Sequence, residues 1–118
     1  MTQKLTEARR DEAWIGDAVL TLFVRDWLLT GSYRSTADRN ALHEHFTSNQ
    51  FLSCFGEPTL VEAEIGRTYL ANGLEAAFHH IQTRLLQTFV RSARKRGLRV
   101  DALSEPPVRP ALAEPGPK

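Results

Sequence analysis

The feature that most constrains this fold is a proline-free, strongly apolar segment near the start of the chain, residues 5–29. Its good helix formers predict one long helix. From residue 13 onward, apolar side chains surround most of the circumference of that helix, a pattern typical of a helix buried on most sides. One narrow polar stripe interrupts them, with its members spaced four residues apart: Asp17, Thr21 and Arg25. We therefore expect a helical protein organised around a largely buried first helix.

The remainder of the chain also has a helical pattern. Four further helices are predicted, over residues 35–46, 50–55, 58–71 and 74–96. Gly31, Gly56 and the pair Asn72-Gly73 separate most of the helices, and no segment shows the alternation of a strand. The fold class is therefore all-α, with about five helices. A chain of 118 residues with 42% hydrophobic content is sufficient for one modest core.

The chain changes character after Gly97. Five of its six prolines lie at or beyond Pro106. A segment so rich in proline propagates neither a helix nor a sheet ladder. We predict one helical domain over residues 1–98 and a disordered, flexible Pro-rich tail over residues 99–118.

Charge and cysteine content limit the setting of the protein. The net charge of +1 argues against a strongly basic coat for nucleic acid, although local clusters matter more than the sum. Cys54 is the only cysteine, so no internal disulfide forms, and its position between two phenylalanines predicts a small core residue. No apolar run approaches the roughly 20 residues that span a bilayer. We expect a cytoplasmic protein that does not enter membranes.

Two carboxylates occupy unusual positions. Asp17 lies on the apolar first helix, where an ionised group is costly without a partner, and Glu62 has a similar place in the helix over residues 58–71. Gly16 and Gly66 stand beside them inside helices, at a cost of about 1 kcal/mol each. Helices that crossed at these glycines would bring the two carboxylates together. A buried ion pair with arginine and a metal site both remain open as explanations.

A basic run covers residues 91–99, with five cations in nine residues. It is either a solvated helix end, where cations favour the helix dipole, or a contact for a polyanion. The histidines occur as the pairs 43/45 and 79/80, whose spacing does not place both members on one helix face. A zinc site is therefore not expected, and we predict surface histidines.

Three segments together resemble the ribonuclease III catalytic domain. Residues 12–20, Glu-Ala-Trp-Ile-Gly-Asp-Ala-Val-Leu, are similar to the family signature with its Gly-Asp-Ala-Val core. Residues 61–77 are similar to the second motif, in which Glu-Ala and Ile-Gly precede Tyr-Leu, Gly-Leu and small residues. Between them, Ser-Asn-Gln-Phe-Leu at 48–52 resembles the family's Ser-Asn-x-x-Leu segment. The three segments occur in the family's order.

The resemblance implies a ribonuclease III-like helical bundle that acts as a homodimer and cleaves double-stranded RNA with Mg²⁺, or with Mn²⁺ in its place. Hard cations of this kind prefer oxygen ligands, and a bound ion activates water and neutralises charge on the phosphate. Asp17 and Glu62 match the aspartate of the first motif and the glutamate of the second. They are therefore expected to bind the metal and to act in catalysis. RNA phosphates are expected to contact three residues of the basic run: Arg94, Lys95 and Arg96.

The chain also departs from the family pattern. Ala13 stands where a glutamate is usual, Thr59 where an aspartate is usual, and Arg10 where another glutamate is usual. Fewer acids should weaken metal binding. Glu12 and Glu64 are not expected to replace the missing groups, because they face other sides of their helices.

The short stand-alone branch, mini-ribonuclease III, resembles this chain most in length. Its members lack the separate module that binds double-stranded RNA, and they carry a small residue at the position of Ala13. We therefore expect a Mg²⁺-dependent endoribonuclease for double-stranded or structured RNA. The alternative is a catalytically impaired RNA-binding protein with the same fold, and a third interpretation is a helical interaction module unrelated to RNA.

Overall fold

The computed structural model describes residues 6–30, 36–98 and 100, and over these residues it is all-α, with no strand. The elements are α1 (Glu7–Thr30), α2 (Thr36–Phe46), α3 (Asn49–Leu52), the 3₁₀ turn η1 (Ser53–Phe55), α4 (Pro58–Asn72), α5 (Leu74–Ile81), the π-helical turn η2 (Gln82–Leu86) and α6 (Gln87–Lys95). The predicted fold class and helix positions are confirmed. The predicted Pro-rich tail lies outside the described residues, apart from Val100, so the domain boundary stays a prediction.

Local sequence signals account for both ends of α4. The Glu57 carboxylate accepts a hydrogen bond of 3.0 Å from the Leu60 N–H, and Pro58 occupies the first turn, where a missing N–H costs nothing. At the other end, Gly73 adopts φ 94°, a conformation that favours glycine. Since α4 carries Glu62, these signals determine where that carboxylate stands.

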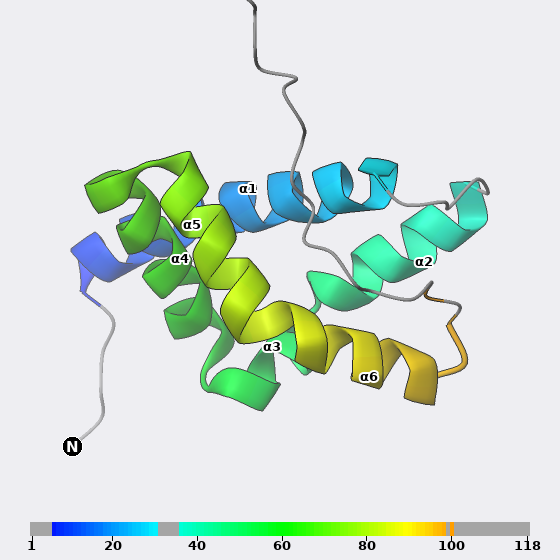
Figure 1. The fold of residues 1–118 in the computed structure, drawn as a ribbon. Coiled ribbons are helices and arrows are strands. Elements are labelled where there is room, and N and C mark those ends of the chain that lie inside the picture. The colour runs from blue at the N-terminus through cyan, green and yellow to red at the C-terminus, as the bar shows by residue number, and fades with distance from the viewer. Residues whose placement is uncertain (1–5, 31–35, 99, 101–118) are drawn as a thin grey trace, which may run out of the picture.

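The segments α5, η2 and α6 continue one another as the long helix that the sequence predicts over residues 74–96 (Figure 1). The π turn lies where two adjacent residues, Leu85 and Leu86, are both buried. A π turn holds one extra residue relative to a regular helix turn. Burial of adjacent residues does not by itself require such a turn, since Val19 and Leu20 are both buried in the regular helix α1.

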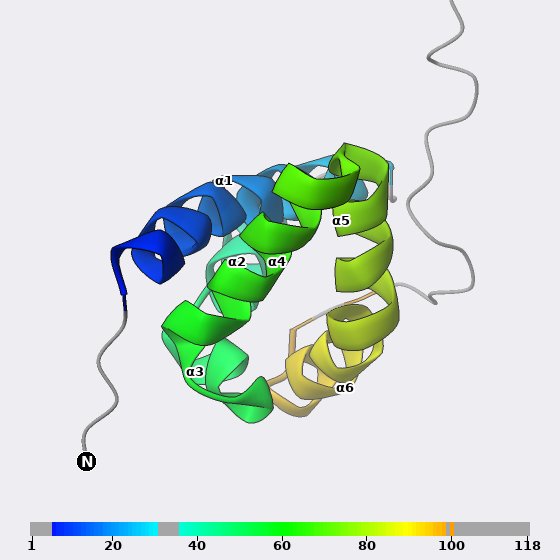
Figure 2. The ribbon, with the colours of Figure 1, turned by 90° about the vertical axis from the view of Figure 1, so that its left-hand side faces the viewer.

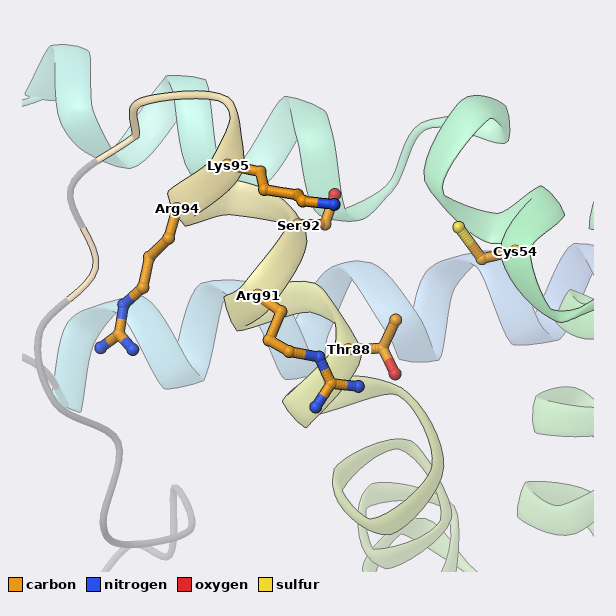
Figure 3. A pocket seen from close by; sticks show the side chains of 6 residues that line it. All are labelled: Cys54, Thr88, Arg91, Ser92, Arg94 and Lys95. Atoms are coloured by element: carbon orange, nitrogen blue, oxygen red, sulfur yellow. The ribbon is translucent and has the colours of Figure 1, made fainter.

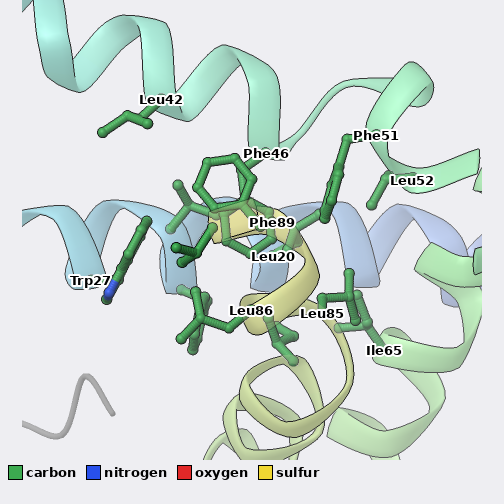
Figure 4. Packing of buried hydrophobic residues seen from close by; sticks show 14 of the residues in the cluster. Leu20, Trp27, Leu42, Phe46, Phe51, Leu52, Ile65, Leu85, Leu86 and Phe89 are labelled. Atoms are coloured by element: carbon green, nitrogen blue, oxygen red, sulfur yellow. The ribbon is translucent and has the colours of Figure 1, made fainter. Parts of the chain in front are cut away.

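The core is centred on aromatic rings from distant parts of the chain (Figure 4). Phe46 of α2 and Phe89 of α6 stack with their centroids 4.2 Å apart, and both are fully buried. Trp27 of α1 packs against Phe89 edge to face at 5.7 Å, and Phe51 of α3 does the same at 5.4 Å. These contacts join four helices around one apolar centre.

The expectation that the first helix is buried on most sides is wrong for the single chain. Neighbouring helices cover one side of α1, which crosses α4 and passes α5 (Figures 1 and 2). On the other side Trp14 is 78% exposed, and Leu22 and Leu29 are exposed as well. Within the described residues, no helix combines the length and the apolar content that a membrane span requires.

Candidate functional site

The contact between α1 and α4 is a close crossing at two glycines. A Cβ atom built on Gly16 would lie 1.8 Å from the carbonyl oxygen of Glu62, and one built on Gly66 would lie 1.8 Å from that of Glu12. No side chain fits in either place, so the two backbones approach directly. The crossing that the sequence predicts is present.

This crossing brings the two predicted carboxylates together. Asp17 is exposed and Glu62 is half-buried, and their carboxyl groups lie within hydrogen-bonding range of each other. Burial, the Asp17 charge and the hydrogen bond to Asp17 together raise the pKa of Glu62 to about 7, and Glu57 adds a weaker contribution. Two acids this close share one proton, unless a cation compensates the second negative charge.

An arginine partner does not explain the pair. Among the residues that the structure describes, no lysine or arginine lies within ion-pair distance of Asp17 or Glu62. The buried ion pair left open by the sequence is therefore absent from this part of the chain. What remains is an acidic pair in which the raised pKa of Glu62 favours a bound proton.

The neighbouring acids are engaged elsewhere, as their helix positions predict. The Glu12 carboxylate pairs with the guanidinium groups of Arg67 at 3.8 Å and Arg9 at 3.9 Å. Glu64 is exposed, and its charge acts on His80 of α5. Neither residue supplements the acidic pair.

The number of acids bears directly on metal binding. Over the described ranges, no set of three or more histidine, cysteine, aspartate or glutamate side chains is grouped closely enough to form a metal cage. Ala13 is buried and Thr59 is partly exposed, and neither side chain provides a carboxylate. The site therefore offers two carboxylates. Mg²⁺ is usually held by one or two carboxylates, with waters and substrate phosphates completing its shell.

The predicted phosphate contacts lie at the end of α6, which both views place away from the crossing of α1 and α4 (Figures 1 and 2). Arg94, Lys95 and Arg96 are all exposed. The Arg94 guanidinium donates to the carbonyl of Val100 at 3.2 Å, and the Arg96 guanidinium donates to the side-chain oxygen of Gln50 at 3.2 Å. Two of the three predicted contacts thus have intramolecular roles.

Two sequence predictions about single residues are wrong. Cys54 is exposed, because it lies in η1, where no residue is buried, while its neighbour Phe51 in α3 occupies the core. His45 is buried between Phe51 and Phe89, and its Nε2 atom lies 2.8 Å from the Ser92 hydroxyl. Burial, with a smaller effect of Arg96, lowers the pKa of His45. A polar partner on α6 thus allows a histidine to occupy a core position.

Comparisons with family models, with curated proteins and with solved structures find no match to this chain.

Proposed function

We propose that this chain is a Mg²⁺-dependent endoribonuclease that cleaves double-stranded or structured RNA as a homodimer. The observation that carries the proposal is the meeting of Asp17 and Glu62 at a glycine crossing, with no cation from the described chain between them. The ribonuclease III-like motifs contain these same two acids. Geometry and motif therefore point to one place in the fold.

The donor chemistry fits Mg²⁺. Carboxylate oxygens are hard ligands, and two of them are a common protein contribution to a magnesium site. The raised pKa of Glu62, about 7, reflects negative charge that a divalent ion would offset. Loss of the Glu62 proton near neutral pH would create the ligand.

The chain's own residues would orient the ion and the RNA. Asp17 and Glu62 hold their carboxylates on two helices, and the glycine contact allows the backbones of those helices to approach closely. When bound, Mg²⁺ supplies an activated water and neutralises charge on the phosphate. Lys95 and its cationic neighbours would attract the RNA backbone.

The exposed apolar face of α1 supports the proposed dimer. Trp14, Ala18 and Leu22 are spaced four residues apart, so they form one stripe on the outer surface of the helix. A tryptophan exposed over 78% of its surface is unusual in a single chain, and such residues are enriched at interfaces. Asp17 lies beside this stripe, so a second copy would bring its own acid pair nearby.

The test is cleavage of a labelled RNA duplex with Mg²⁺ and with EDTA. We expect Mg²⁺-dependent cleavage by the wild-type protein and a loss of roughly 100-fold or more in Asp17→Asn and Glu62→Gln, since a group acting on the reacting phosphate contributes on this scale. Glu64→Gln is the matched control, because this exposed acid on the same helix faces α5. Equal loss in the control, or cleavage without a divalent ion, would contradict the proposal.

A second candidate is an RNA-binding protein that retains the fold without efficient cleavage. The observation that favours it is the presence of only two acids at the crossing, with Ala13 and Thr59 at the other two positions. The same assay separates the two functions. A duplex that is bound but never cut, at any Mg²⁺ concentration, would favour this second function.

A further inference from the structure

A groove on the side of α6 that faces η1 is lined by basic and hydroxyl-bearing side chains (Figure 3). It has a volume of about 630 Å³ and lies between α6 and η1. Its described lining consists of Cys54, Thr88, Arg91, Ser92, Arg94 and Lys95, with no carboxylate and no aromatic ring. Most of the surface that faces the groove is apolar, so its positive charge is confined to the ends of the cationic side chains, and it offers no aromatic ring on which a base could stack.

The groove side of α6 has a regular pattern. Thr88, Arg91, Ser92 and Lys95 occupy positions i, i+3, i+4 and i+7, so they form one stripe along the helix. Figure 3 shows the ends of Arg91 and Lys95 reaching toward the side on which Cys54 lies, whereas Arg94 extends the other way. The Cα atoms of Arg91 and Lys95 lie about 6 Å apart along the helix axis, because each of the four residue steps between them adds a rise of about 1.5 Å.

The cations of the stripe have no competing partner. Among the described residues, no carboxylate lies within ion-pair distance of Arg91 or Lys95. Ser92 is positioned by the buried His45, whose Nε2 atom is 2.8 Å from its hydroxyl oxygen. The stripe therefore offers two free positive charges and one hydroxyl supported from the core.

We propose that this groove binds the phosphodiester backbone of an RNA strand, with Arg91 and Lys95 contacting neighbouring phosphates and the hydroxyls of Thr88 and Ser92 donating to phosphate oxygens. Such contacts position a strand without reading its sequence. The alternation of cation and hydroxyl favours RNA over an acidic peptide, because serine, threonine and basic side chains together are the usual donors to phosphate. The proposal rests on the RNA-binding part of the proposed function and does not require cleavage.

Equilibrium binding of a fluorescent oligouridylate in EDTA tests the groove separately from any nuclease activity. Each phosphate contact to a single strand contributes about 0.7 to the slope of log K against log salt, so Arg91→Gln/Lys95→Gln should reduce that slope by about 1.4. If affinities converge near 1 M salt, this is roughly a 60-fold weaker affinity at about 50 mM. Arg9→Gln/Arg10→Gln removes the same charge from the start of α1 and should leave the slope unchanged.

Cys54 provides a second readout, because the sole cysteine of the chain is exposed in the groove wall. Saturating oligouridylate should slow its alkylation by N-ethylmaleimide several-fold in the wild-type protein and in the Arg9/Arg10 control. Unprotected Cys54 in a wild-type protein that binds the RNA would overturn the proposal, as would an unchanged salt slope in Arg91→Gln/Lys95→Gln or no RNA binding at low salt. Equal protection by polyglutamate would overturn the assignment to RNA.

The nuclease proposal and the groove proposal can each be rejected without rejecting the other. Binding through the groove without any Mg²⁺-dependent cleavage would reject the nuclease and retain the groove. Cleavage abolished by Glu62→Gln, together with unaltered binding by Arg91→Gln/Lys95→Gln, would do the reverse.

Discussion

Gly66→Ala would test whether the crossing of α1 and α4 organises this fold. An added Cβ would lie 1.8 Å from the carbonyl oxygen of Glu12, whereas ordinary contact begins at 3.4 Å. The helices would therefore have to separate by about 1.6 Å at this point. Overpacking of this kind costs roughly 1–3 kcal/mol, and here the obstacle is backbone rather than a flexible side chain. Helix propensity acts in the opposite direction, favouring alanine by about 1 kcal/mol.

We expect the steric cost to prevail, with a net loss of up to about 2 kcal/mol in the free energy of unfolding, or up to roughly 16 °C in Tm. Urea denaturation followed by circular dichroism measures this change. Ala71→Gly on the same helix is the matched control, because this exposed position lies away from the crossing and should obey propensity alone, losing up to about 1 kcal/mol on gaining a glycine. A Gly66→Ala variant that is more stable than the wild type would refute the reasoning.

Two further predictions concern the acid pair and the core. Because folding raises the pKa of Glu62 from 4.5 to about 7, the folded state binds more protons than the unfolded state in that window, and stability should fall as the pH rises through it. In urea titrations, Glu62→Gln should gain stability relative to the wild type as the pH rises, by on the order of 1–2 kcal/mol above pH 7; a difference between the two proteins that does not change with pH would contradict the assignment. Phe89→Ala should cost about 3–5 kcal/mol in the same experiment, because this fully buried ring contacts three other aromatic rings and His45; a loss below about 1 kcal/mol would show that the core is centred elsewhere.

The helices could be predicted from the sequence because their signals are local. Pro58 and Gly73 punctuate α4, and both act through their own backbone geometry. The crossing was also predictable, since a glycine inside a helix is costly unless another backbone approaches it. Asp17 lies next to Gly16, and Glu62 lies one turn before Gly66. A crossing at these glycines therefore predicts that the two carboxylates lie close together.

Other features depend on tertiary context that periodicity does not contain. The exposure of Trp14 could not be predicted, because hydrophobicity shows only that a surface avoids water and not which partner covers it. The π turn at η2 could not be predicted either, because adjacent buried residues such as Leu85 and Leu86 also occur in the regular helix α1. Helix spacing groups Arg91 with Lys95, but the placement of this stripe beside Cys54 needed the position of η1, which lies more than 30 residues away along the chain.

The central claim is that the Asp17 and Glu62 carboxylates together hold a divalent cation, and Mn²⁺ titration followed by electron paramagnetic resonance tests it most directly. At a pH above 7, where Glu62 is ionised, we expect one ion per chain. Asp17→Asn and Glu62→Gln should each weaken binding about tenfold or more, equivalent to at least about 1.4 kcal/mol, while Glu64→Gln should not. Mn²⁺ affinity that is the same in all four proteins, or no binding by the wild type, would contradict the account.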